Sequence, residues 1–255
     1  MRDAKFRFTD RVVDYLKYRP SYPNAVIELI GERFQLGKDA VIADVGAGTG
    51  IFTRQLLNAG YEVFAVEPNH AMRQAAENQL MDFDGFKCIA GSAEQTELPD
   101  RQVDLVTAAQ AFHWFDIESA RAEFMRVTRP PHRILLVWND RRNGDGGFND
   151  AYEQFLLQWC DEYVAVRSNC QDEERLRKFF AGRLPDCSVF ANNQMLNWEA
   201  LQGRVKSCSY VPGTEDPRHV PMMCELRHLF DQFQQAGKVQ IVYDTKAFSG
   251  KLGDN

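Results

Sequence analysis

The chain has 255 residues, 44% of them hydrophobic and 26% charged, which is typical of one large globular domain or of a domain with an insertion. The net charge of -6 argues against a nucleic-acid partner, because proteins that bind a phosphate backbone usually carry a basic surface. No apolar run approaches the ~20 residues of a membrane span and the N-terminus is charged, so we expect a cytoplasmic protein, monomeric or homodimeric, without a membrane partner.

Patterns typical of helices and of strands alternate over the first half of the chain. Apolar residues at helical spacing predict a helix from Pro23, which a first helical turn tolerates, to about Phe34. The apolar run from Ala40 to Val45 predicts a buried strand. Strands separated by helices in this way form a parallel sheet covered on both faces, which defines a doubly wound α/β domain. The pattern then predicts helices over Ile51–Asn58, His70–Leu80 and 117–128, with Asn69 and Asp116 as caps, and strands over 61–67, 85–92, 102–109 and 133–138.

The pattern changes after Trp138. The segment NDRRNGDGGFND is rich in turn residues, but its acidic residues lack the spacing of a calcium-binding loop, so we interpret it as a connection. Helices, strands and a possible hairpin are predicted beyond it, over Phe148–Val166, Asp172–Ala181, 187–198, Pro217–Gln235 and 238–250.

Six cysteines are spread along the chain without a C-x-x-C pair. Zinc sites and disulfide frameworks usually show closely spaced cysteines in recognisable patterns. We therefore predict reduced thiols and no metal site. The cysteines are Cys88, Cys160, Cys170, Cys187, Cys208 and Cys224.

The first predicted strand leads into the glycine-rich stretch VIADVGAGTG. In open α/β sheets a ligand binds beyond the carboxyl ends of the strands, and Gly46, Gly48 and Gly50 would let the backbone approach it closely. A dinucleotide-binding turn has the pattern G-x-G-x-x-G, whereas Ile51 stands where the third glycine belongs. Asp44 would repel a pyrophosphate and favour an ammonium group, although it could instead cap the turn. The stretch therefore indicates a ligand with positive charge and no phosphate.

A second acidic residue ends the next predicted strand. Glu67 follows Gly46 by 21 residues, close to the ~20 expected for an acid that accepts hydrogen bonds from ribose hydroxyls. S-adenosylmethionine combines a ribose and an adenine with a sulfonium and an amino acid, and it carries no phosphate. The segments that carry a family resemblance are DVGAGTG, VEPNHAM, GSAEQTELPD, VDLVTAAQAFHWFD, YRPSYP and WNDRR. In them the chain resembles the class I S-adenosylmethionine-dependent methyltransferases, particularly the small-molecule group (methyltransferase type 11) that includes trans-aconitate methyltransferases.

This resemblance implies a fold, a cofactor and the residues that bind it. The fold is a seven-stranded, mostly parallel sheet in the order 3-2-1-4-5-7-6, with a helical insertion after strand five. One structural domain would then consist of an N-terminal cap and cofactor-binding core (1–140), the insertion (141–185) and a C-terminal completion of the sheet (186–255). The cofactor is S-adenosyl-L-methionine, and its product is S-adenosyl-L-homocysteine. The implied cofactor-binding residues are Asp44, Gly46, Ala47, Gly48, Glu67, Pro68, Met72, Ser92, Ala93 and Gln110, with Glu94 as a weaker member.

One turn departs from the family pattern. The family usually has Pro-Gly-Gly before strand five, whereas this chain has Pro130-Pro131-His132. Proline fixes its own backbone and restricts the residue before it, so we expect a differently built turn, remote from the cofactor.

The chemistry of the donor limits what the acceptor site needs. Transfer from a sulfonium is an in-line displacement, so the protein mainly aligns the reactants in a dry pocket. A hydroxyl acceptor needs a general base, whereas a carboxylate is already charged at neutral pH. His113 is the candidate base because it follows a strand at the ligand edge, although its aromatic neighbours also fit a structural histidine. Enzymes that methylate nucleic-acid adenine or glutamine amides typically carry Pro-Pro-aromatic after strand four. This chain has QAFHWF at that position. We therefore expect the methyl acceptor to be a small molecule with a carboxylate or hydroxyl oxygen.

Four further residues are candidates for the acceptor site. Tyr18 and Arg19, in YRPSYP, could close over the cofactor and hold a carboxylate, since arginine binds carboxylates bidentately. Tyr18 is a candidate catalytic residue, and Trp114 and Arg141 are candidates for binding the acceptor. The alternatives are an ordinary loop for YRPSYP and a solvated side chain for Arg141.

Two other functions remain open. A nicotinamide-dependent (NAD) oxidoreductase would share the fold, but the missing third glycine, Asp44 and the lack of a Tyr-x-x-x-Lys dyad oppose it. A non-catalytic S-adenosylmethionine-binding regulatory protein is also compatible, because catalysis by alignment requires no obligatory nucleophile.

Overall fold

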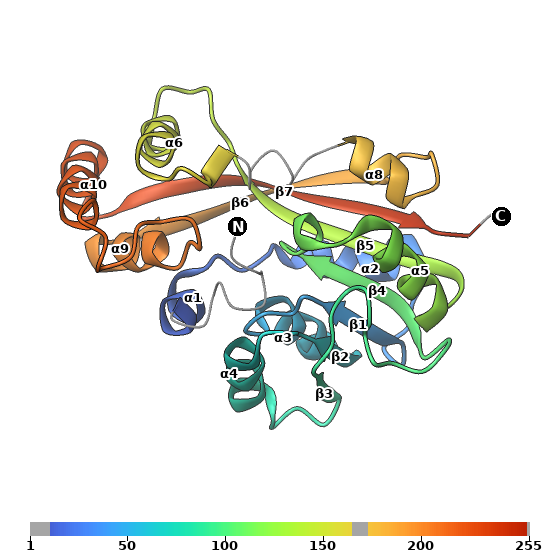
Figure 1. Cartoon of the computed structure of the whole chain (residues 1–255). Coiled ribbons are helices and arrows are strands. Elements are labelled where there is room, and N and C mark those ends of the chain that lie inside the picture. The colour runs from blue at the N-terminus through green and yellow to red at the C-terminus, as the bar shows by residue number, and fades with distance from the viewer. Residues whose placement is uncertain (1–10, 165–172, 254–255) are drawn as a thin grey trace.

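The computed structural model describes residues 11–164 and 173–253, and one twisted sheet runs through them (Figure 1). Val166 and Asp172, where predicted helices end and begin, and Cys170 lie outside these residues.

Within the described residues the sheet has seven strands in the order β3-β2-β1-β4-β5-β7-β6. The first five strands are parallel, whereas β7 runs antiparallel to both β5 and β6. This arrangement confirms the predicted fold and strand order. The strands are β1 (Val41–Val45), β2 (Glu62–Val66), β3 (Phe86–Ile89), β4 (Val103–Ala109), β5 (Thr128–Arg141), β6 (Asp186–Leu196) and β7 (Val239–Lys251).

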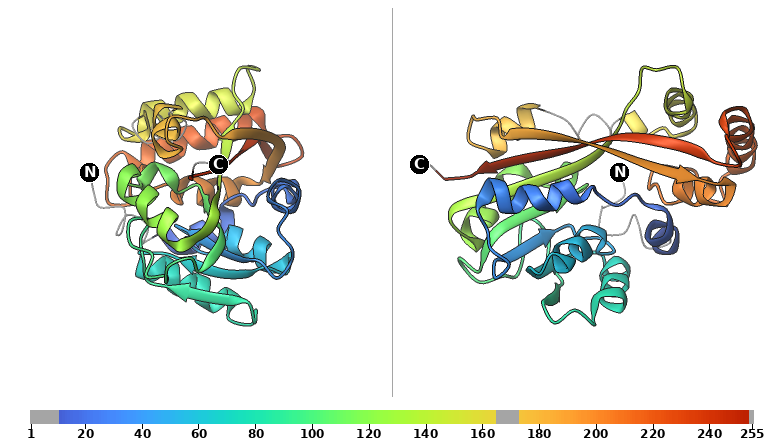
Figure 2. Two further views of the ribbon diagram at one scale, coloured as in Figure 1. Left: turned by 90° about the vertical axis from the view of Figure 1, so that its right-hand side faces the viewer. Right: turned by 180° about the vertical axis from the view of Figure 1, so that it is seen from behind.

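Helices cover both faces of the sheet (Figures 1 and 2). Alternate residues of β5 enter two hydrophobic clusters, Leu135 and Val137 on one face and Leu136 and Trp138 on the other, as the period of two in a strand requires. A strand covered on both faces needs the continuous apolar run that the sequence shows. The core helices are α2 (Asn24–Phe34), α3 (Ile51–Asn58), α4 (His70–Leu80), α5 (Ile117–Val127) and α8 (Glu173–Phe179).

Both predicted helix caps are present. The side chain of Asn69 accepts a hydrogen bond from the backbone N–H of Met72 at 3.0 Å, and that of Asp116 accepts one from Ser119 at 3.0 Å. Each cap satisfies a backbone N–H that has no partner inside the helix, so the start of each helix is a local property of the sequence.

A third hydrophobic cluster lies beyond the carboxyl end of β5. It packs α6 (Phe148–Trp159), α9 (Trp198–Lys206) and α10 (His219–Phe233) around the first half of β7. Figure 1 shows these three helices gathered at the same end of β6 and β7. This cluster is the structural basis of the cap over the ligand edge.

Several predicted boundaries are wrong, and two helices were missed. The predicted helix from Phe148 to Val166 breaks earlier, because α6 ends at Trp159. Strand β5 is longer than the predicted 133–138. The missed helices are α9 and α1 (Val12–Tyr18). Helix α1 has only seven residues, too few for a helical period to stand out in the sequence.

The Pro130-Pro131-His132 segment is incorporated into the amino end of β5. The Pro130–Pro131 peptide bond is cis, and His132 has a φ of 57°. The pairing between β4 and β5 shifts register here, between Val103 and Leu105. The turn therefore lies at the opposite end of β5 from Arg141 and from the ligand edge of the sheet.

No helix in residues 11–164 and 173–253 is long and apolar enough to cross a membrane. The same residues hold no group of histidine, cysteine and acidic side chains that could bind a metal ion.

Candidate functional site

A cavity of about 220 Å³ lies at the carboxyl ends of β1, β2 and β4. This is the edge where a doubly wound sheet binds its ligands. Eight of the ten predicted cofactor-binding residues line it, together with Glu94 and Trp114; Asp44 and Ala47 do not. The lining residues are Tyr15, Gly46, Gly48, Glu67, Pro68, Met72, Ser92, Ala93, Glu94, Ala109, Gln110, Ala111, Trp114 and Phe115.

The turn after β1 brings bare backbone to the cavity. Gly46 and Gly48 have φ values of 72° and 58°, in the left-handed region that favours glycine. A Cβ at Gly46 would lie 2.5 Å from the Cβ of Ala111, so a side chain has no room there. The amide of Gly46 donates to the carbonyl of Val66 at 2.8 Å, which ties the turn to β2.

Glu67 follows β2 and its carboxylate is held by two backbone amides. Its Oε2 accepts from Gly48 N–H at 2.9 Å and its Oε1 from Asn69 N–H at 2.8 Å. Burial raises the pKa of Glu67, and these hydrogen bonds oppose that rise. A carboxylate can accept about four hydrogen bonds, so both oxygens retain lone pairs for further donors. The side chain therefore fits the two hydroxyls of a ribose.

Asp44 is buried, at 1% exposure, and braces the core beneath the turn. Its carboxylate accepts from the hydroxyls of Thr53 at 2.6 Å and Thr107 at 2.9 Å, which links β1 to α3 and β4. Burial raises the pKa of Asp44 to about 6, while the hydrogen bonds from the two threonines oppose the rise. Asp44 therefore supports the turn from below and does not line the cavity.

The segment after β4 shapes the far side of the cavity. Gln110 has a φ of 56°, and its side-chain amide donates to the carbonyl of Asn139 on β5 at 3.1 Å. A short 3-10 helix, η3 (Phe112–Trp114), follows. Trp114 lines the cavity, whereas His113 does not, although its ring lies 4.7 Å from that of Trp114. The role of His113 as a general base stays a prediction.

Helix α1 supplies a lining residue that the sequence analysis missed, Tyr15. The neighbouring candidates point elsewhere: the hydroxyl of Tyr18 donates to Glu199 on α9 at 2.8 Å, and Arg19 donates to the carbonyl of Ser207 at 2.9 Å. The guanidinium of Arg19 lies over the ring of Tyr15, 4.7 Å from its centroid. Tyr15 carried no sequence signal because α1 itself was not predicted, whereas the missed lining residues Ala111 and Phe115 lie inside the quoted QAFHWF motif.

Arg141 is largely buried, with 13% of its side chain exposed. It forms an ion pair with Glu153 at 3.1 Å, and its guanidinium lies 5.4 Å from the ring centroid of Tyr152. The interpretation of Arg141 as a solvated side chain is therefore wrong.

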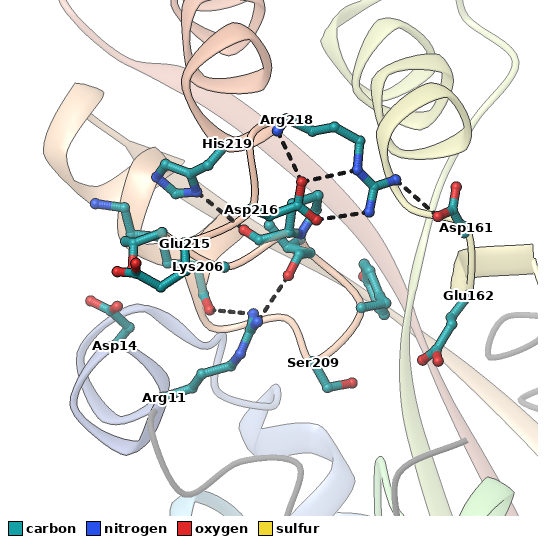
Figure 3. A pocket seen from close by; sticks show the side chains of 15 residues that line it. Arg11, Asp14, Asp161, Glu162, Lys206, Ser209, Glu215, Asp216, Arg218 and His219 are labelled. Atoms are coloured by element: carbon teal, nitrogen blue, oxygen red, sulfur yellow. Dashed lines mark hydrogen bonds and ion pairs between the residues drawn. The ribbon is translucent and has the colours of Figure 1, made fainter.

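A second cavity, of about 760 Å³, lies between α1, the segment before α10 and the segment after α6 (Figure 3). Both of its arginines are engaged with the protein itself. Arg218 pairs with Asp216 and Asp161, and Arg11 donates to backbone carbonyls, including that of Val211 at 2.8 Å. The smaller cavity, with its glycine turn and buried carboxylate, is the better candidate for a nucleoside ligand.

Comparison with known proteins identifies the class to which this arrangement belongs. Residues 43–136 match the family described as a methyltransferase domain. The methyltransferase-like protein C25B8.10 of Schizosaccharomyces pombe is 28% identical over 263 residues, covering 98% of this chain and 96% of the relative. The methyltransferase Rv3342 of Mycobacterium tuberculosis is 37% identical over 140 residues, 55% of each chain, so this match spans about half of either protein. A solved structure from Anaeromyxobacter dehalogenans, assigned as a type II methyltransferase, covers 93% of this chain and 100% of its own with a TM-score of 0.66 and 22% identity.

The fold is therefore that of an α/β methyltransferase. Residues 43–136 are a methyltransferase type 11 domain, and the chain is similar to methyltransferases over nearly its whole length. This confirms the predicted family and enzyme class and sets the NAD-dependent alternative aside. A methyltransferase domain of this type implies S-adenosylmethionine as the methyl donor.

Proposed function

We propose that this chain transfers a methyl group from S-adenosyl-L-methionine to a carboxylate or hydroxyl oxygen of a small organic molecule. The observation that carries the proposal is the buried Glu67 carboxylate, held by Gly48 and Asn69 beside a cavity at the ligand edge of the sheet. In this proposal Glu67 accepts hydrogen bonds from the ribose hydroxyls. The net charge of -6 supports a small-molecule acceptor over a nucleic acid.

The remaining lining residues support the same assignment. The turn at Gly46 and Gly48 carries no side chains, so its backbone can lie close to the methionine part of the donor. Met72 and Ala93 offer apolar contacts for an adenine. The bound donor supplies a methyl group that is already activated on a sulfonium, so the protein has to align the acceptor and exclude water. His113 would accept the proton of a hydroxyl acceptor, and a carboxylate acceptor would need no base.

Titration calorimetry with S-adenosylhomocysteine tests the cofactor site. Glu67→Ala removes the acceptor of two charge-assisted hydrogen bonds, each of about 1.5–3 kcal/mol, and we expect affinity to fall about 100-fold or more. Glu62→Ala is the matched control, because Glu62 begins the strand that Glu67 follows, is partly exposed and pairs with Lys87. Equal affinity of the Glu67 variant and the native protein would contradict the ribose assignment.

Turnover of labelled donor tests the acceptor. A panel of small organic acids, alcohols and phenols is expected to include at least one compound that gains the label at oxygen. A rate that rises with pH through the histidine range for hydroxyl acceptors alone would support a general base. Absence of any methylated product would contradict methyl transfer to a small molecule and favour a binding role.

A further inference from the structure

Three arginines lie together between the cofactor cavity and the C-terminal helices; we name Arg19, Arg141 and Arg204 the arginine cluster. Arg19 follows α1, Arg141 ends β5, and Arg204 belongs to α9. Arg204 is buried, at 4% exposure. The cluster therefore joins three segments that are far apart in the chain.

The charges of the cluster are only partly compensated. Arg141 pairs with Glu153, but neither Arg19 nor Arg204 has a carboxylate partner within residues 11–164 and 173–253. One nitrogen of Arg204 lies 3.1 Å from the sulfur of Cys208, and its buried Nε has no hydrogen-bond partner; the Nε of Arg19 likewise has none. A buried guanidinium without an anion is unfavourable, so the arrangement indicates a place for an added negative charge.

Two neighbouring groups point to the same place. Burial raises the pKa of the Cys208 thiol, but the net effect of its surroundings is to lower this pKa. The opposing groups are the guanidinium groups of Arg19 and Arg204, a hydrogen bond with Tyr210 and the charge of Arg141. All three arginines of the cluster therefore act on one buried point. The hydroxyl of Tyr152 is also fully buried without a hydrogen-bond partner, and the guanidinium of Arg141 lies over the ring that carries it.

The arginine cluster is adjacent to the proposed methyl donor. Arg19 lies over the ring of Tyr15, which lines the cofactor cavity. Gln110, at the end of β4, lines the same cavity and bonds to Asn139, two residues before Arg141 on β5. On its other side the cluster reaches Tyr210, which lines the cavity of about 760 Å³. A molecule held by the cluster would therefore lie beyond the donor, on the side of the α9 and α10 cap.

We infer that Arg19, Arg141 and Arg204, with the hydroxyl of Tyr152, form the acceptor subsite and that the acceptor is a small organic acid whose carboxylate they bind. This inference rests on the proposed function and narrows it to acidic substrates. A guanidinium and a phenol hydroxyl are both donors, which complements a carboxylate and disfavours an amine or a neutral alcohol that lacks one.

The test is calorimetric binding of mono-, di- and tricarboxylic acids, their amides, and inorganic phosphate to the full chain, with and without S-adenosylhomocysteine. We expect at least one carboxylic acid to bind and its amide to bind at least 10-fold more weakly. Arg204→Met should weaken the binding of that acid at least 10-fold and leave the affinity for S-adenosylhomocysteine unchanged. Arg142→Met is the matched control, because Arg142 is adjacent to the cluster but exposed and paired with Asp244.

Tyr152→Phe provides a second variant if Arg204→Met does not fold, since it removes only an oxygen that has no partner in the protein. We expect Tyr152→Phe to weaken the binding of the acid about 5-fold. The inference is overturned if no carboxylic acid binds, if amides or phosphate bind as well as acids, or if both variants bind like the native chain. Binding of the acid without binding of S-adenosylhomocysteine would sink the proposed donor and leave the acidic subsite standing.

Discussion

At the scale of single residues, the two glycines of the turn after β1 differ in what a side chain would meet. Both have positive φ, but a Cβ on Gly46 would collide with Ala111, whereas nothing lies within 4 Å of one on Gly48. We expect Gly48→Ala to lower the free energy of unfolding by about 1–2 kcal/mol through backbone strain. Gly46→Ala should lower it by a further ~1–3 kcal/mol, because it also overpacks the site. Urea denaturation measures both, and equal losses would contradict the steric assignment.

Asp44 makes a residue-scale prediction about pH. Because burial raises its pKa from 3.8 to about 6, the folded state holds the proton more tightly than the unfolded chain does. The contribution of Asp44 to stability therefore falls as pH rises from about 4 to about 6 and stays low above that. Asp44→Asn keeps the shape without the charge, so at pH 7.5 it should be more stable than the native protein by up to about 3 kcal/mol.

The pH dependence of this difference is the control. At pH 4.5 the native carboxyl is largely protonated in the folded state, and the advantage of Asp44→Asn should shrink by about 2 kcal/mol. Urea denaturation of the ligand-free protein at the two pH values gives the comparison. A difference that does not change with pH would show that burial does not raise the pKa of Asp44.

At the scale of elements, α1 packs against α9 and contributes Tyr15 to one wall of the cavity. A Cβ on Gly203 would lie 2.0 Å from ring atoms of Tyr18, so Gly203→Ala must displace this ring, which packs the end of α1 against α9. Since α1 carries Tyr15, we expect affinity for S-adenosylhomocysteine to fall about 10-fold, with little change in the free energy of unfolding. Trypsin cleavage after Lys17 should become faster.

Gly213→Ala is the matched variant, because a Cβ there meets nothing within 4 Å. It should bind S-adenosylhomocysteine like the native chain. Native affinity and native trypsin resistance in Gly203→Ala would mean that α1 does not depend on this contact.

At the scale of the whole molecule, β7 connects all three hydrophobic clusters. Its Ile241 belongs to the cap cluster, Ala247 to one face of the core, and Phe248 packs against the other face. We therefore expect one cooperative unfolding transition in spite of the predicted division into core, insertion and completion. Far-ultraviolet circular dichroism and tryptophan fluorescence should give coincident urea curves, because Trp138 reports the core and Trp198 the cap. Two separate transitions would contradict this.

The core and most of the cavity wall could be predicted because their signals are local. Apolar runs, the caps at Asn69 and Asp116 and the glycine turn each depend on a few consecutive residues. Glu67 could be placed because a fixed βαβ spacing separates it from Gly46. The exits of β2, β3 and β4 meet at one sheet edge for the same reason, so Pro68, Ser92 and Gln110 line the predicted cavity.

The sequence by itself determined the α/β class and the glycine turn through short-range periodicity and motif spacing, and its resemblance to a known family implied the strand order and most of the residues that line the cavity. Only the tertiary structure decided that Tyr15 enters that wall, that Tyr18 turns to Glu199 and that Arg141 is buried beside Tyr152. It also brought Arg204, on a helix that was not predicted, to Arg141 and Arg19. Such contacts join segments distant in the chain, and their geometry depends on how the antiparallel β7 carries the C-terminal helices back over the ligand edge of the sheet.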